Sequence, residues 1–134
     1  FWQIRTGKKN HGAPIPPKRL TIGRAEWRRH GFASLDAGPA GGRVETRPLR
    51  IARGALLLNA DASRGRVRVG LLEADGAPIA GFGLDDVEPL QSDATRAVVR
   101  WKGGAAPSAR PVRVVIEMIN ARLFSLASND APGR

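Results

Sequence analysis

The sequence predicts an all-β domain, an antiparallel β-sandwich (jelly-roll-like) preceded by a short strand pair or arm. Two observations support this fold class. Apolar residues recur at every second position in several short segments, which is the period of a half-buried strand. Turn-forming residues separate these segments, and no long stretch repeats apolar side chains with the 3.6-residue period of a helix.

Four segments fit the strand pattern, namely residues 55–60, 66–71, 96–101 and 111–119. The last is the longest and is the best candidate for the centre of a sheet. The segment 55–60 is a short apolar run, and the Asn-Ala-Asp sequence that begins at Asn59 reads as a turn signal after it. The side chains predicted to face inward are Val67, Val69 and Leu71, then Ala97, Val99 and Trp101, and finally Val112, Val114, Ile116 and Met118.

The Asp75-Gly76 pair lies between two strand-like segments and predicts a hairpin. Both residue types tolerate the positive φ of a type I′ turn, so residues 67–73 are expected to pair with residues 77–82. Phe32 and Phe82 each follow a glycine within strand-like segments, and we expect both rings in the core.

The formal net charge is +10 and the pI is about 11.6, which raises the question of a nucleic-acid or other polyanionic partner. The excess is mostly arginine spread along the chain, so a solvated sheet face is the favoured interpretation and nucleic acid is an unlikely partner. Arginines predicted to face solvent at alternate strand positions are Arg66, Arg68, Arg96 and Arg100. A stand-alone basic β module that binds nucleic acid or another polyanion stays open as the alternative function.

Length and end composition divide the chain into three parts. Residues 1–26 are expected to be the remnant of a preceding domain or a linker arm, residues 27–127 the sandwich, and residues 128–134 a disordered tail. The chain begins at Phe1 without a leader pattern, so we expect it to be a piece of a longer protein. No apolar run is long enough to span a membrane, and without cysteine the compartment is not indicated.

The run from Trp27 to Gly38, WRRHGFASLDAG, resembles the junction between a β-propeller and a C-terminal sandwich in bacterial family 32-like glycosyl hydrolases. The order and spacing of further matching pieces extend this resemblance over roughly residues 27–125. These pieces are Leu58-Asn59-Ala60, Gly65 to Val69, Asp75-Gly76, Ile79 to Phe82, Val99 to Gly103 and Ala121 to Ser125.

The resemblance implies an accessory domain that buttresses the catalytic β-propeller of the same parent chain. The parent would be a glycoside hydrolase, and its catalytic carboxylates would lie on blades outside this sequence. Phe1 to Arg24 is similar to the strand pair that closes the last blade, so Phe1, Trp2 and Trp27 are the expected interdomain contacts.

No catalytic, cofactor-binding or metal-binding residue is predicted, and no cofactor is expected. Carbohydrate is a further candidate partner, and the candidate ligand contacts are Asn10, His11 and Trp101, although Trp101 is better explained as core. A set of hard oxygen ligands that calcium would prefer is better explained by turn formation; its members are Asn59, Asp61, Asp75 and Asp85.

Overall fold

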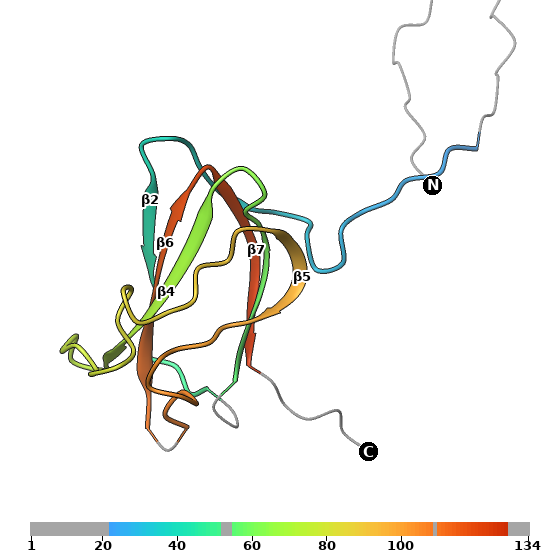
Figure 1. The fold of residues 1–134 in the computed structure, drawn as a ribbon. Helices are drawn as coiled ribbons and strands as arrows, with labels where there is room; N and C mark the ends of the chain where they lie inside the picture. The colour runs from blue at the N-terminus through green and yellow to red at the C-terminus, as the bar shows by residue number, and fades with distance from the viewer. Residues whose placement is uncertain (1–21, 52–54, 109, 129–134) are drawn as a thin grey trace, which may run out of the picture.

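The computed structural model describes residues 22–51, 55–108 and 110–128, and these form a β-sandwich of two antiparallel sheets (Figure 1). The predicted all-β sandwich is therefore confirmed, while its jelly-roll connectivity stays a prediction. The four-stranded sheet has the order β1-β7-β3-β5 and the three-stranded sheet the order β2-β6-β4. The strands are β1 (Leu35–Ala37), β2 (Gly42–Glu45), β3 (Leu56–Asp61), β4 (Arg66–Glu73), β5 (Asp93–Val98), β6 (Val112–Ile119) and β7 (Ala121–Ser128).

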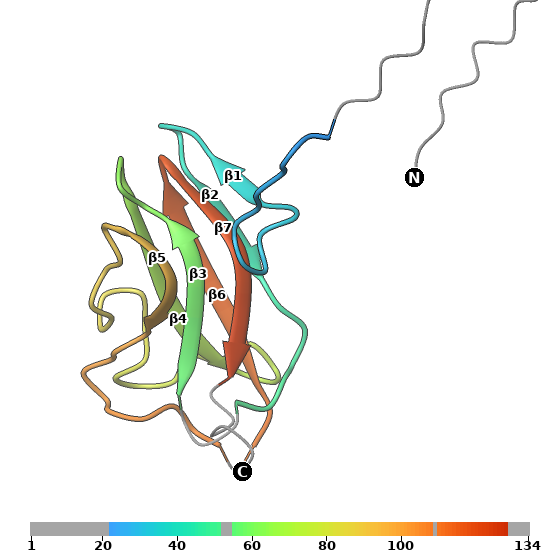
Figure 2. The ribbon, with the colours of Figure 1, turned by 90° about the vertical axis from the view of Figure 1, so that its right-hand side faces the viewer.

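Three connections cross from one sheet to the other at the same end of the sandwich. They join β1 to β2, β3 to β4, and β6 to β7, and their turns lie together at the top of Figure 2. The last crossover is a single residue, Asn120, which has a φ of +45°. Its backbone N–H donates to Gly38 O of the first crossover at 3.1 Å, so two of the three turns are hydrogen-bonded to one another.

The core lies between the two sheets and explains the period-two pattern of the sequence. Alternate side chains of β4 and β6 are buried against alternate side chains of β3 and β7. The largest fully buried side chains are Ile51, Leu56, Leu71, Ile116, Val67, Val69, Val112 and Val114. Burial of apolar area of this kind is the main favourable term in folding.

Most strand predictions are confirmed within a few residues. Residues 111–119 form β6, which is the central strand of its sheet as expected. The predicted strand 96–101 needs correction, because β5 begins earlier and ends at Val98. Val99 and Trp101 are nevertheless buried and Val98 is exposed, as the alternation predicts. The turn predicted at Asn59 is wrong, since β3 continues through Asn59 to Asp61.

The predicted hairpin at Asp75-Gly76 is only partly correct. Gly76 has a φ of +95°, but Asp75 is not among the residues with positive φ, so the turn is not type I′. Residues 77–82 form no strand because Pro78 lacks an N–H and Gly81 turns the chain at a φ of +81°. The segment still follows the edge of β4, where Leu71 N donates to Phe82 O at 2.8 Å.

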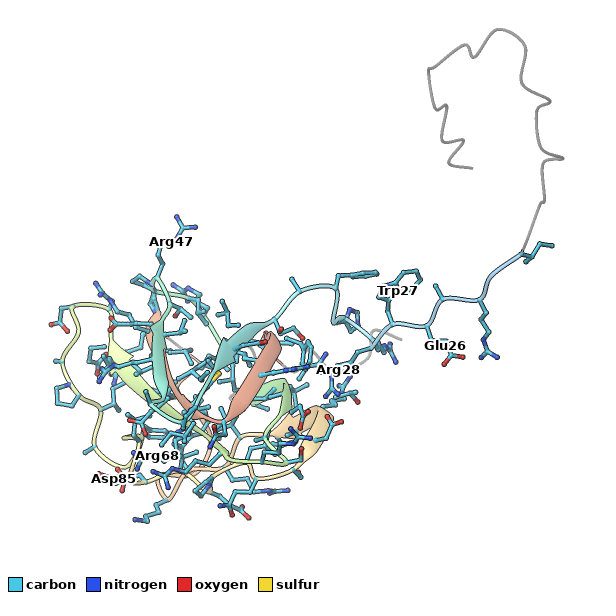
Figure 3. The ribbon with its side chains drawn as sticks, turned by 90° about the horizontal axis from the view of Figure 1, so that it is seen from above. Glu26, Trp27, Arg28, Arg47, Arg68 and Asp85 are labelled. Carbon is cyan, nitrogen blue, oxygen red and sulfur yellow. The ribbon has the colours of Figure 1, made fainter. Side chains whose placement is uncertain are left out.

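The outer face of the three-stranded sheet is charged, as the alternating arginines predict, but Arg68 is not simply solvated. Its guanidinium lies between Glu117 on β6 (2.6 Å) and Asp85 (2.8 Å). The hydrogen bond to Glu117 is the largest of the effects that raise the pKa of Arg68. Arg66, two residues earlier, is exposed as predicted. Figure 3 shows Arg68 and Asp85 close together at this side of the domain.

Candidate functional site

Asn59, in the middle of β3, is the buried polar residue around which the first candidate surface is built. Only 3% of it is exposed. Both neighbouring strands slip their register at this point. On β5 the partner changes from Ala97 opposite Leu58 to Ala94 opposite Ala60, and on β7 a similar shift occurs between Asn59 and Ala60. Such bulges locally open the ladder and re-aim side chains, and the Asn59 amide meets the segment before β1 on the outer face of the sheet.

Arg28 provides the partner for this buried amide. Its Nε donates to Asn59 Oδ1 at 2.5 Å, while the Asn59 amide nitrogen donates to Arg29 O at 2.7 Å. The same guanidinium reaches Asp93 Oδ1 on β5 (2.5 Å) and lies 4.6 Å from the centre of the Phe124 ring on β7. These contacts join the segment before β1 to three strands of the four-stranded sheet.

The contact between Arg28 and Asn59 fixes the segment that presents Trp27 and Phe32, which we call the aromatic pair. Their ring centroids are 6.2 Å apart, and the side chains are 68% and 85% exposed. Figure 3 shows Arg28 directed toward the sandwich and Trp27 away from it. The expectation that Phe32 is a core residue is therefore wrong. It belongs to the bend before β1 and packs on Trp27.

A second candidate surface is a groove at the end where the three crossovers meet, which we call the crossover groove. Its volume is about 680 Å³. Each crossover region supplies three lining residues: Asp36, Ala37 and Gly38 from the first, Asp61, Ser63 and Arg64 from the second, and Asn120, Ala121 and Arg122 from the third. Loops clustered at one end of a rigid sandwich are a common place for binding sites.

Two carboxylates and two guanidinium groups line the crossover groove. Asp61 Oδ1 accepts hydrogen bonds from the Ser63 hydroxyl (2.7 Å) and backbone N–H (3.1 Å). These two bonds, helped by the charges of Arg122 and Arg28, hold the pKa of Asp61 below its usual value of 3.8. Asp36 accepts from Ser34 at 2.6 Å and lies 3.6 Å from Arg122 Nε. Asp61 is therefore ionised at neutral pH.

Only two of the residues that the sequence predicts as interdomain or ligand contacts lie in the part of the chain that the structure describes, namely Trp27 and Trp101. Phe1, Trp2, Asn10 and His11 lie outside the described residues. Trp27 is exposed at the surface defined above, where an interdomain contact was predicted. Trp101 is buried, and its indole Nε1 donates to Val69 O at 2.8 Å, which favours the core role over ligand contact.

The candidate calcium ligands do not come together as one site. Asp61 and Asp75 each accept a backbone N–H two residues later, which is the turn geometry predicted for them. Asn59 is buried and bonded to Arg28, and Asp85 pairs with Arg68. Over residues 22–51, 55–108 and 110–128, no group of three or more His, Asp or Glu side chains is placed to bind a metal ion.

Sequence reasoning missed the Arg28–Asn59 contact and the crossover groove. The signal for the first was an asparagine inside an apolar strand segment, because a buried amide requires partners for its polar atoms. The signal for the second was the set of polar residues that flank three strand ends. Which ends of the strands meet depends on the topology, so no local pattern indicated the groove.

Within the described part of the chain, no helix is long and apolar enough to cross a bilayer. Comparison with known proteins finds no family model, no curated protein and no solved structure that matches this sequence.

Proposed function

We propose that this chain is a non-catalytic accessory β-sandwich of a glycoside hydrolase-like protein, which packs against the catalytic β-propeller preceding it in the parent chain. The observation that carries the proposal is the aromatic pair, Trp27 and Phe32, exposed at the N-terminal side of the sandwich. The sequence resemblance over residues 27–125 supports the identity of the neighbour.

The aromatic pair fits a docking role because its position is fixed before any partner arrives. Trp27 precedes Arg28, whose side chain is bonded to Asn59, Ala60 and Asp93. A preorganised aromatic side chain loses little conformational freedom on docking and buries a large apolar area. Two adjacent exposed rings on a chain with few aromatics are typical of a surface that another protein covers.

The acidic side chains favour a non-catalytic role. Glycoside hydrolysis usually needs two carboxyl groups that face each other across the scissile bond, about 5 to 9.5 Å apart. Here Asp61 supports a turn through Ser63, Asp85 pairs with Arg68, and Asp86 accepts the Gly83 N–H at 3.1 Å. Asp61 and Asp86 therefore stabilise their own turns, and Asp85 connects its turn to Arg68 on β4.

The first test is to read the coding sequence upstream of Phe1. We expect about 300 residues of four-stranded blade repeats, a repeat length of about 40–50 residues being typical of propellers. A start codon close to Phe1 would contradict the proposal. In that case, heparin binding that weakens with salt would test the alternative, a basic module for polyanions.

The second test measures the exposure of Trp27 by hydroxyl-radical footprinting, because mass spectrometry of the digested protein reads each tryptophan separately. Strong oxidation of Trp27 is expected in the 134-residue chain, and weak oxidation in the parent protein that includes the propeller. The buried Trp101 should be protected in both. Equal oxidation of Trp27 in the two proteins would contradict the proposal.

Two variants then test whether association with the propeller depends on the aromatic pair or on any exposed apolar side chain. Trp27→Ala combined with Phe32→Ala should release the sandwich from the propeller after the linker is cut by a protease. Val98→Ala removes an apolar side chain that is also half exposed, but on β5. It should leave the two parts associated.

A further inference from the structure

We infer that a crevice at the β5 side of the sandwich binds small uncharged molecules that have an apolar chain. The crevice lies between residues 87–92 and residues 97–100, and we call it the edge crevice. It shares no lining residue with the crossover groove and includes neither ring of the aromatic pair. The inference therefore goes beyond the proposed docking function and stands without it.

The two stretches of chain that border the edge crevice are joined at one end. Residues 87–92 lead directly into β5, and the two stretches run in opposite directions, as the antiparallel bridge between Val87 and Trp101 shows. Next to that bridge, Glu88 N donates to Arg100 O at 2.9 Å. The crevice is therefore closed at this end by backbone contacts.

Further along, the two stretches separate because each pairs with a different sheet. Leu90 exchanges two backbone hydrogen bonds of 2.9 Å with Val67 on β4, whereas Ala97 pairs with Leu58 on β3. β3 and β4 belong to different sheets, and packed sheets lie about 10 Å apart. The fold therefore opens a space between the two stretches, and the core side chains form its floor.

The floor of the edge crevice favours an apolar ligand. All the buried residues of its lining are aliphatic, namely Leu58, Val67, Val69, Val87 and Val99. A charged group placed against them would lose its hydration without gaining a partner, whereas an apolar group gains free energy by leaving water. Exposed polar side chains at the mouth, Gln91 and Ser92, can form a hydrogen bond with a neutral head group such as a hydroxyl.

The size of the edge crevice limits the ligand to one small molecule. Its volume is about 250 Å³. An apolar cavity of about 150 Å³ is sufficient for benzene, so this space fits a chain of about six to ten carbon atoms. A polypeptide strand could not run through the crevice, because Glu88 and Arg100 are hydrogen-bonded to each other across one end.

Ala97 leaves part of this space open. It packs against the core and lines the crevice from β5 with a single methyl group. A larger aliphatic side chain at this position would occupy the space that the ligand needs. Because filling an open space beside a core is usually tolerated or stabilising, such a variant should fold.

The edge crevice is tested by titrating the isotope-labelled 134-residue chain while its backbone amide resonances are recorded. The probes are 1-hexanol, hexanoate and 6-aminohexanoate, which share a six-carbon chain but carry no charge, one charge and two opposite charges. At millimolar concentrations, 1-hexanol should shift the amides of residues 90–92 and 97–100 selectively. It should do so at lower concentration than either charged probe, because a charged group gains no partner on the floor.

A matched pair of variants makes the result specific. Ala97→Leu should weaken the binding of 1-hexanol by at least about tenfold, because the added carbon atoms fill the crevice. Ala127→Leu is the same change at an exposed position of β7 that does not line the crevice, and it should bind as the unchanged chain does. If Ala97→Leu does not fold, Ala97→Val replaces it, with a smaller loss of binding expected.

Three results would overturn the inference. The first is that 1-hexanol shifts no crevice amide selectively. The second is that the folded Ala97 variant binds 1-hexanol as well as Ala127→Leu does. The third is that hexanoate or 6-aminohexanoate shifts the same amides at lower concentration than 1-hexanol, which would show that charge recognition and not the apolar floor governs the site.

Discussion

The side chains of Arg28 and Asn59 form a hydrogen bond of 2.5 Å that connects the segment before β1 to the buried middle of β3. The amide nitrogen of Asn59 also bonds to the backbone at Arg29 O, so one buried side chain fixes two consecutive residues of that segment. The position of Trp27 therefore depends on Asn59, a residue that is distant from it in the sequence.

Truncation of either partner should destabilise the domain, and the two effects should not add. Arg28→Ala leaves the Asn59 oxygen buried without its partner, and Asn59→Ala removes the acceptor of Arg28 Nε while Asp93 and Ala60 O still accept from the guanidinium. Each should lower the free energy of unfolding by about 1–3 kcal/mol, and the double variant should lose clearly less than the sum of the two. Urea unfolding at pH 7 measures all four proteins. Strict additivity would show that the two side chains are not coupled. As a control, Arg47→Ala removes an exposed arginine and should change the free energy of unfolding by less than about 0.5 kcal/mol.

The close approach at Gly65 predicts a large difference between two glycine-to-alanine changes at the same end of the sandwich. In Gly65→Ala the new methyl group would overlap Ile119 O, whereas no atom lies within 4 Å of a Cβ at Gly38. Gly65→Ala should destabilise by about 1–3 kcal/mol or more through overpacking, and Gly38→Ala should be nearly neutral. Thermal unfolding followed by circular dichroism compares the two. Similar melting temperatures would mean that the crossovers are not in contact.

The same change, Trp to Phe, should have different effects at the buried Trp101 and at the exposed Trp27. Trp101→Phe removes the indole donor of a buried hydrogen bond to Val69 O and should cost about 1–3 kcal/mol. Trp27→Phe changes an exposed ring and should cost less than about 0.5 kcal/mol in the isolated chain. Denaturant unfolding gives both values. A smaller loss for Trp101→Phe than for Trp27→Phe would contradict the assignment of Trp101 to the core.

The lowered pKa of Asp61 predicts a stability difference that depends on pH. The folded pKa lies below the unfolded value, so ionised Asp61 stabilises the fold above the unfolded pKa of 3.8, and this contribution is lost as the pH falls through the folded pKa. Asp61→Asn retains an acceptor for the Ser63 turn but has no charge. It should therefore be less stable than the unchanged chain at pH 7, with a difference that shrinks as the pH falls below about 4. A difference that does not change with pH would contradict the shift.

The sequence was sufficient to predict the all-β sandwich and its central elements. In β6 and β4, one face consists of large aliphatic side chains and the other includes charged ones, so only a sandwich interior can accept the first face. The same period-two rule assigned Val99 and Trp101 to the core, although the regular strand ends before them.

The failures have particular physical causes. Phe32 follows a glycine as Phe82 does, but only Phe82 is covered by a neighbouring segment that includes Gly103 and Trp101. The burial of Asn59 depends on Arg28, which is distant in sequence and belongs to a segment without regular secondary structure. Long-range pairings of this kind are set by topology, and no local residue pattern encodes them.

The irregular segment between β4 and β5 has a consequence for association between molecules. It forms backbone hydrogen bonds along the outer edge of β4. Leu71 N donates to Phe82 O, and Val67 and Leu90 exchange two hydrogen bonds of 2.9 Å. An apolar strand with an uncovered edge is a template for strand addition and aggregation. Because this segment contains Pro78 and bends at Gly81, it masks the most apolar edge of the three-stranded sheet without itself offering a straight strand to a second molecule.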